Sequence, residues 1–195
     1  LIKEHSSEYP EKVSTQGFTE MGVQEIAEAI DPLIKFDRIT KVSSLISCIG
    51  AFTEKHVTNV AVTGGSSTGK TYNAKNIVGL FPPENVFELG NVSKRAFLHM
   101  QGEYDKETNT ITIDFENKII LLLDTPNTEV METLRSFMSQ DAKEITFAIT
   151  DKNEGGGQKT KNIKLRGPAM FVICTAGLHR DEQESTRLLV LSPEI

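Results

Sequence analysis

A glycine-rich segment in the first half of the chain restricts the fold more than any other feature. Residues 64–71 read GGSSTGKT and fit the pattern G-x-x-x-x-G-K-[ST]. The segment follows a short β-branched run at 57–62 (VTNVAV) and precedes a stretch expected to be helical from Lys70. Glycines let the backbone curl so that its N–H groups face one point, where the helix N-terminus adds partial positive charge. The segment therefore predicts a strand, a phosphate-binding loop and a helix.

The residues of this loop have distinct expected roles. Lys70 is expected to hold the β- and γ-phosphates of a nucleotide, and Thr71 to turn its hydroxyl toward a bridging Mg²⁺. The cofactors predicted here are thus ATP and Mg²⁺. A glycine-rich turn that binds nothing is disfavoured, because lysine, hydroxyl and flanking elements all match. The predicted nucleotide-binding residues are Gly64, Gly65, Ser66, Ser67, Thr68, Gly69, Lys70 and Thr71.

The rest of the chain alternates short strands with helices. Helical spacing predicts one or two short helices in 21–34 and further helices at 39–50, from 70 onward, at 93–100 and at 129–139. Strands are expected at 57–62, 86–89, 119–123 and 169–174, with a small hairpin around 105–115 and a long one over 145–165, and a last element of unassigned type lies at 188–191. Continuously apolar strands are typical of parallel sheets covered on both faces. The pattern predicts a three-layer α/β sandwich, mainly parallel, with an inserted β-hairpin.

Composition narrows the class of protein. The 195 residues fit one domain, and we expect a leader with short helices over 1–38 and the core over 39–195, as a piece of a longer chain because it begins with Leu1. No apolar run approaches the ~20 residues that cross a bilayer, so we expect no membrane partner. The two cysteines lie in apolar stretches and are expected to be buried thiols. We expect a location in the cytoplasm or in the nucleic-acid compartment of a host, without secretion.

A single acid ends the most apolar strand. Asp124 follows the run 119–123 (IILLL), so a buried strand delivers a carboxylate to the edge of the sheet where the phosphate-binding loop also lies. This position suits a carboxylate that holds Mg²⁺ through water. The alternative is a surface aspartate that caps the next helix, a task that Thr125 or Asn127 can perform equally well.

The order of these elements resembles the core of AAA+ ATPases. The phosphate-binding loop (Walker A), the hydrophobic run ending in Asp124 (Walker B), a hairpin and a strand ending in a small polar residue (171–175, FVICT) follow one another. A hairpin just before that last strand is similar to the pre-sensor 1 insertion of MCM-like and superfamily 3 replicative helicases of plasmids and viruses. The resemblance covers roughly residues 40–195.

The resemblance implies two further catalytic residues. Thr175 occupies the place of a sensor that touches the γ-phosphate or orients the attacking water; otherwise it satisfies its own backbone. Arg187, with Arg180 as second choice, is implied to reach the nucleotide of a neighbouring subunit. A guanidinium there stabilises the transferring phosphoryl group, commonly by ~10³ to 10⁵ in rate. The alternative for Arg187 is a solvated arginine in a charged turn.

One departure from the family concerns the hydrolytic base. The Walker B motif of the family usually ends Asp-Glu, where the glutamate polarises the attacking water, but here Thr125 follows Asp124. Glu129 is the first candidate for a substitute, if the intervening turn aims it correctly. Nucleotide binding is therefore predicted more firmly than hydrolysis, and slow turnover or an unusual base fits the sequence.

The long hairpin carries most of the evidence for nucleic acid. The chain has a net charge of −6, which argues against a whole face coated with nucleic acid. The hairpin nevertheless gathers basic residues around a glycine-rich tip, namely Lys152, Lys159, Lys161, Lys164 and Arg166. In a ring of subunits such tips would line a channel and grip phosphates, with Lys159 and Lys161 as the expected contacts. The alternative is a solvated hairpin with lysines for solubility.

The sequence thus favours the ATPase core of an AAA+ motor, a DNA helicase or replication-initiator ATPase. Its expected partners are further copies of itself in a ring, with six as the expected number, and single-stranded DNA. The alternative is a nucleotide-dependent binding module or clamp with little hydrolysis. A P-loop kinase of a small metabolite is a third possibility, which the absence of an arginine-rich lid disfavours.

Overall fold

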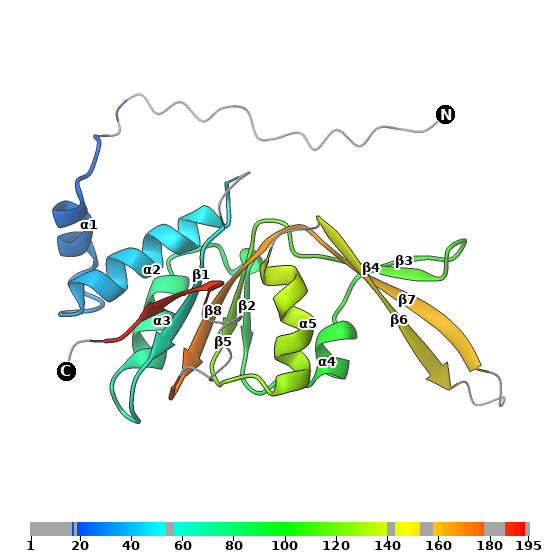
Figure 1. The fold of residues 1–195 in the computed structure, drawn as a ribbon. Helices are drawn as coiled ribbons and strands as arrows, with labels where there is room; N and C mark the ends of the chain where they lie inside the picture. The colour runs from blue at the N-terminus through cyan, green and yellow to red at the C-terminus, as the bar shows by residue number, and fades with distance from the viewer. Residues whose placement is uncertain are drawn as a thin grey trace.

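A five-stranded parallel sheet forms the centre of the molecule (Figure 1). The computed structural model describes residues 17, 19–53, 57–139, 143–152, 158–177 and 186–193. The strand order is β2-β5-β8-β1-β9, and every neighbouring pair is parallel. The strands are β1 (Asn59–Thr63), β2 (Val86–Leu89), β5 (Lys118–Leu122), β8 (Ala169–Thr175) and β9 (Leu188–Leu191).

Helices cover both faces of this sheet. On one face lie α2 (Arg38–Gly50) and α3 (Lys70–Val78), and on the other α4 (Lys94–Leu98) and α5 (Thr128–Met138). The short α1 (Val23–Ile30) packs beside α2, and a 3₁₀ turn, η1 (Pro83–Asn85), precedes β2. The predicted three-layer α/β sandwich is confirmed. None of the described helices is long and apolar enough to cross a bilayer.

Successive side chains of the central strands point to opposite faces of the sheet and pack against different helices. Ile119 and Leu121 of β5 pack with α3, whereas Ile120 and Leu122 pack with α5. All seven residues of β8 are buried. Strands buried on both faces read as continuous apolar runs, which is why their positions were predictable from the sequence.

Both cysteines lie in this core as free thiols, as predicted. Cys48 is fully buried on α2, its Sγ 4.0 Å from the Sδ of Met170. Burial raises the pKa of the Cys48 thiol to about 12, because the apolar surroundings disfavour the thiolate. Cys48 is therefore a packing residue.

The two predicted hairpins join into one second sheet. Its strands are β3 (Glu103–Asp105), β4 (Thr110–Asp114), β6 (Glu144–Lys152) and β7 (Gln158–Arg166), in the order β3-β4-β7-β6. Strand β4 runs parallel to β7, with Ile113 opposite Leu165. The long hairpin is thus widened on one side into a four-stranded sheet that extends beyond α4 and α5 (Figure 1).

Phe115 ties the second sheet to the sandwich. It directly follows β4, is fully buried, and its N–H donates to the carbonyl of Arg166 at 2.8 Å. Its ring lies 5.6 Å from the ring of Phe97 on α4 and 5.6 Å from that of Phe137 on α5. The ring of Phe87 on β2 lies 5.9 Å away. One side chain therefore contacts three elements of the sandwich.

Replacing Phe115 by alanine should destabilise the fold strongly, because the cavity would open where both sheets meet. We expect the free energy of unfolding in urea to fall by roughly 3–5 kcal/mol. Phe36→Ala is the control, since that ring is 72% exposed and its loss leaves the core intact. A loss for Phe115→Ala no larger than for Phe36→Ala would show that the second sheet is anchored elsewhere.

Candidate nucleotide-binding site

The loop between β1 and α3 is curled as the sequence predicts. Ser67 and Gly69 have left-handed backbone conformations, with φ of 63° and 81°, and Gly69 is the N-cap of α3. The N–H of Asn73 donates to the carbonyl of Gly69 at 2.8 Å, which starts the helix. The ammonium of Lys70 donates to the carbonyl of Gly65, so its charge is held against the loop.

Gly64 is required at the start of this loop. A Cβ at this position would lie 2.8 Å from the Oγ1 of Thr68, closer than carbon and oxygen tolerate. The Thr68 hydroxyl donates to the carbonyl of Gly65 at 3.0 Å and fixes the loop from within. The first glycine of the motif thus permits the close packing that closes the loop.

The parallel register brings the ends of three strands to one edge. Thr63, the last residue of β1, lies opposite Thr175, the last residue of β8. Leu122 of β5 lies opposite Ile173, so Asp124 follows at the level of Thr175. The cap of α5 is Asn127, whose side chain accepts from the N–H of Val130 at 3.0 Å. The helix-capping alternative for Asp124 is thereby removed, and its exposed carboxylate lies at the edge that carries the loop.

Cys174 shows how closely these groups converge. Burial raises the pKa of this thiol, while a hydrogen bond with the Thr71 hydroxyl and the positive charge of Lys70 act in the opposite direction. The negative charge of Asp124 also acts on Cys174 and raises its pKa further. One buried side chain of β8 therefore lies near Lys70, Thr71 and Asp124 together.

The oxygen atoms at this edge suit a magnesium ion. Mg²⁺ prefers hard oxygen ligands, keeps several waters, and is commonly held by one or two protein groups together with phosphates. The Thr71 hydroxyl and the Asp124 carboxylate both act on the Cys174 thiol and are oxygen groups of the kind that this ion takes. The residues present thus fit the ion that the sequence predicts.

Thr175 makes a hydrogen-bond network that sequence reasoning missed. Its Oγ1 accepts from the Oγ1 of Thr125 at 2.8 Å and donates to the carbonyl of Gly177 at 2.5 Å. The N–H of Gly177 in turn donates to the same Oγ1 at 3.2 Å. Thr125, which stands where the resembled AAA+ ATPases carry a glutamate, is thus joined to the predicted sensor residue across neighbouring strands.

The loop between α1 and α2 lies against the first turn of α3. The Tyr72 hydroxyl donates to the carbonyl of Leu33 at 2.9 Å, and the Asn73 amide donates to Asp37 at 2.6 Å. The buried Lys41 holds the loop from α2 through an ion pair with Asp31. The only sequence signal for this contact was the place of Tyr72, directly after Thr71.

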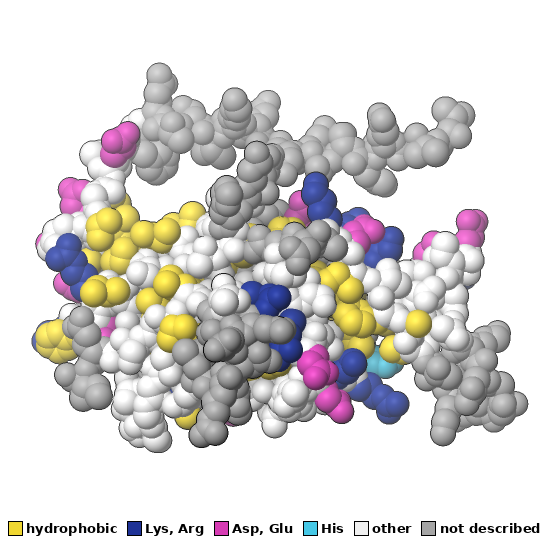
Figure 2. Space-filling model, in the orientation of Figure 1, with side chains coloured by type: hydrophobic (Ala, Val, Ile, Leu, Met, Phe, Trp, Pro, Cys, Tyr) yellow, Lys and Arg dark blue, Asp and Glu magenta, His cyan; other side chains and the backbone are white. Residues whose placement is uncertain are grey.

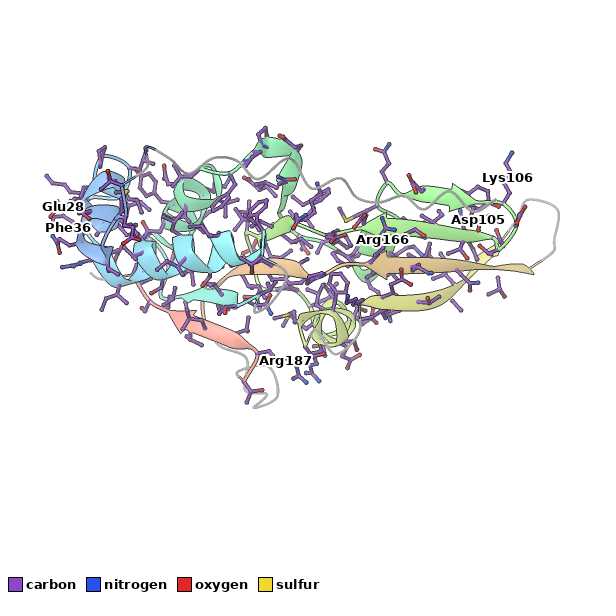
Figure 3. The ribbon with its side chains drawn as sticks, turned by 90° about the horizontal axis from the view of Figure 1, so that it is seen from above. Glu28, Phe36, Asp105, Lys106, Arg166 and Arg187 are labelled. Carbon is purple, nitrogen blue, oxygen red and sulfur yellow. The ribbon has the colours of Figure 1, made fainter. Side chains whose placement is uncertain are left out.

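A cavity of about 770 Å³ opens beside this contact. Figure 3 places Glu28 and Phe36 together at this end of the molecule, next to α2. Phe36 is 72% exposed, and its ring with that of Tyr72 gives the cavity aromatic surface. The lining residues are Glu28, Asp31, Pro32, Leu33, Lys35, Phe36 and Tyr72.

Comparison with known families agrees with this geometry. Residues 23–191 match the model of a family described as the MTBMA_p00010 P-loop domain. The chain belongs to this P-loop domain family. The match includes the loop, Asp124, the hairpin and Thr175, and it supports a P-loop NTPase in general. A search of curated proteins gave no match.

In this P-loop domain, Arg187 lies at the amino-terminal end of the parallel strands, and the P-loop lies at their carboxyl end. It directly precedes β9, whose first residue, Leu188, is opposite Asn59 at the start of β1. The P-loop follows the other end of β1, a full strand length away. Figure 3 shows Arg187 extending outward from the turn before β9. The structure therefore does not bring Arg187 to the P-loop of its own chain, and Arg180 lies outside the described residues.

The basic residues of the hairpin separate onto two faces. Lys161 shares a face with Ile163 and Leu165, and its Nζ lies 5.2 Å from the centre of the Tyr104 ring. On the other face, Lys164 pairs with Glu144 at 3.0 Å and Arg166 with Asp114 at 2.5 Å. The hairpin is therefore not uniformly basic. Its tip and the side chain of Lys159 lie outside what the structure describes.

Lys70→Ala should remove nucleotide binding without unfolding the chain, because Lys70 supplies phosphate charge and takes no part in the core. Titration with a fluorescent ATP analogue, alongside circular dichroism, measures both properties. Lys118→Ala is the charge-matched control, since Lys118 lies at the amino end of β5 and contacts Glu84 and Asn85. Unchanged affinity of Lys70→Ala would show that the loop does not bind phosphate.

Proposed function

We propose that this P-loop domain is the ATP-hydrolysing core of an AAA+ motor, a DNA helicase or replication-initiator ATPase. The observation that carries the proposal is the convergence of the P-loop, Asp124 and Thr175 at one sheet edge, with Thr175 on the strand that follows the hairpin. Only residues 167 and 168 separate β7 from β8. A displacement at the Thr175 end of β8 can therefore reach the hairpin along one continuous length of chain.

The proposed reaction is in-line attack of water on the γ-phosphate of ATP. Lys70 and the N–H groups of the loop would hold the phosphates and offset the charge that develops on them. Thr71 and Asp124 would hold Mg²⁺, which neutralises charge on the phosphate oxygens when bound. The products are ADP and inorganic phosphate.

The cavity beside Tyr72 has the chemistry of a nucleobase site. A planar base can stack on aromatic rings such as Phe36 and Tyr72, and the carboxylate of Glu28, one oxygen of which accepts from the Gln24 amide, can accept a further hydrogen bond from an amino group. The cavity also lies next to the first turn of α3, which holds Thr71. A nucleotide with its phosphates in the P-loop would thus bring its base toward the α1–α2 loop.

Two observations support assembly with further copies of the chain. Arg187 lies at the sheet edge away from its own P-loop, so a nucleotide that it contacts belongs to another subunit. Figure 2 shows hydrophobic side chains gathered over the α1 and α2 end of the molecule. The exposed apolar residues there include Val23, Phe36, Ile39, Ile46 and Ile49. Contiguous exposed apolar surface is typical of protein interfaces.

The second candidate function is a nucleotide-dependent binding module with little hydrolysis. The observation that favours it is Thr125 at the position where the resembled family carries a glutamate. A hydroxyl does not remove a proton from water at neutral pH, so turnover is expected to be slow in either case. The two functions differ in whether a partner accelerates hydrolysis.

ATP turnover measured with and without single-stranded DNA separates the candidates. The motor predicts turnover that DNA stimulates, because DNA contacts on the hairpin are linked through β8 to the site. Lys159→Ala combined with Lys161→Ala should weaken DNA binding while basal turnover is kept. The slope of log K for DNA binding against log salt concentration should become shallower by up to ~0.7 for each of the two lysines. Lys164→Ala is the control, because Lys164 is paired with Glu144 on the other face.

Other outcomes of the same turnover assay support other functions. Tight ATP binding without turnover, with or without DNA, favours the binding module. ADP formation only when a small acceptor is added favours a kinase. DNA affinity equal in the double variant and the native chain contradicts the assignment of Lys159 and Lys161.

Mixing variant subunits tests the proposed role of Arg187. Arg187→Ala should lower turnover but leave ATP affinity of the isolated chain unchanged, because its target lies on a neighbour. When Arg187→Ala subunits are mixed with Lys70→Ala subunits, some interfaces combine an intact P-loop with an intact arginine. ATPase activity should therefore partly return in the mixture. No recovery in a mixture shown to co-assemble would contradict action across the interface.

A further inference from the structure

Under the proposed function, Thr125 occupies the position where the resembled AAA+ ATPases carry the glutamate that polarises the attacking water. It directly follows Asp124 and is joined to Thr175 of the neighbouring strand by a hydrogen bond of 2.8 Å. It is half-buried, and the next residue, Pro126, is buried. The chain on either side of Thr125 is thus fixed by a strand end and by a buried proline, and its hydroxyl is held at the edge that carries the P-loop.

The Thr175 hydroxyl already has a partner for its hydrogen and for both of its lone pairs. A threonine hydroxyl has one hydrogen to donate and two lone pairs to accept with. The hydrogen of Thr175 goes to the carbonyl of Gly177, and its lone pairs accept from the Thr125 hydroxyl and the Gly177 N–H. Thr175 therefore has no donor for a phosphate oxygen in this arrangement, which disagrees with a direct sensor role.

These partners also fix which residue donates in the hydrogen bond between Thr125 and Thr175. Its only hydrogen points to Thr175, because Thr175 donates its own hydrogen to Gly177. Toward any further partner, Thr125 can then act only as an acceptor. Hydroxyls in such a chain polarise one another, so each bond strengthens the next.

We propose that Thr125 is a catalytic residue that accepts a hydrogen bond from the attacking water, and that Thr175 is a positioning residue that orients Thr125. The inference rests on the proposed function, ATP hydrolysis, and replaces the glutamate base by a neutral acceptor. The water oxygen forms the new bond to the γ-phosphorus, and the bond from that phosphorus to the bridging oxygen of ADP breaks. The proton of the water goes to a phosphate oxygen, and Thr125 keeps its own hydrogen throughout.

Trapping with ADP and aluminium fluoride tests this assignment apart from turnover, because that complex mimics the transferring phosphoryl group with its in-line water. Thr125→Val should keep ADP affinity within about twofold of the native chain but weaken trapping at least tenfold, and ATP turnover should fall by a similar factor. Thr125→Ser, which keeps the hydroxyl, should restore both. Thr175→Val should weaken trapping less than Thr125→Val, because it leaves the acceptor in place but unoriented.

Thr133→Val is the matched control, since its hydroxyl donates to the carbonyl of Glu129 within α5, and both trapping and turnover should be unchanged. Trapping by Thr125→Val as tight as in the native chain, or Thr125→Ser as impaired as Thr125→Val, overturns the inference. A native chain that binds ATP but neither traps nor hydrolyses overturns it as well and leaves nucleotide binding standing. A native chain that binds no nucleotide overturns the proposed function itself.

Discussion

The insertion of β8 between β1 and β5 is the constraint on which the rest of the structure depends. Parallel pairing on both sides fixes the register, so that the ends of the three strands lie level. The buried Asn59 reinforces the arrangement, because its side chain donates to the carbonyl of Met138 at 3.3 Å and accepts from the N–H of Phe171 at 3.1 Å. A buried polar group that loses such partners costs about 1–3 kcal/mol, which disfavours any shift of β8. The P-loop, Asp124 and Thr175 meet because this register is fixed.

The second sheet depends on the same strand. Because β7 leads into β8, the hairpin begins where the central sheet is most buried. Phe115 packs the second sheet against α4, α5 and β2, so its inner part shares the core of the sandwich. Figure 3 shows Asp105 and Lys106 at the far turn of the β3–β4 ribbon and Arg166 nearer the centre. The sheet thus joins a well-packed base to an end that extends away from the nucleotide site.

Local patterns were sufficient to predict most of the fold. The apolar runs of β5 and β8 and the glycine pattern of the P-loop depend on neighbouring residues, so the sequence shows them directly. The parallel pairing of β4 with β7 joins segments about fifty residues apart, and no local pattern encodes it. The same limit affected the hairpin charges: the sequence placed Arg166 among the basic residues of the hairpin, and only the structure shows its pairing with Asp114.

How much of the candidate site can be predicted from the sequence differs from residue to residue. The expected roles of Lys70 and Asp124 follow from the motif and the strand end, and the charges of both act on Cys174 in the structure. The hydrogen bond between Thr125 and Thr175 depends on the distance between two strand ends, which the sequence does not contain. The contact of Tyr72 with Leu33 likewise requires the α1–α2 loop to fold back onto α3.

A neutral hydroxyl beside Asp124 changes the balance between binding and turnover under the proposed function. A second carboxylate at this edge would repel the charges of a polyphosphate, so a hydroxyl there favours nucleotide binding. The same hydroxyl cannot remove a proton from water, which leaves more of the barrier to electrostatic stabilisation by other groups. Arg187 is remote from the P-loop of its own chain, so under the proposed function it would supply this stabilisation to a neighbouring subunit. We therefore expect the proposed ATPase to hold ATP when isolated and to reach its full rate only when assembled.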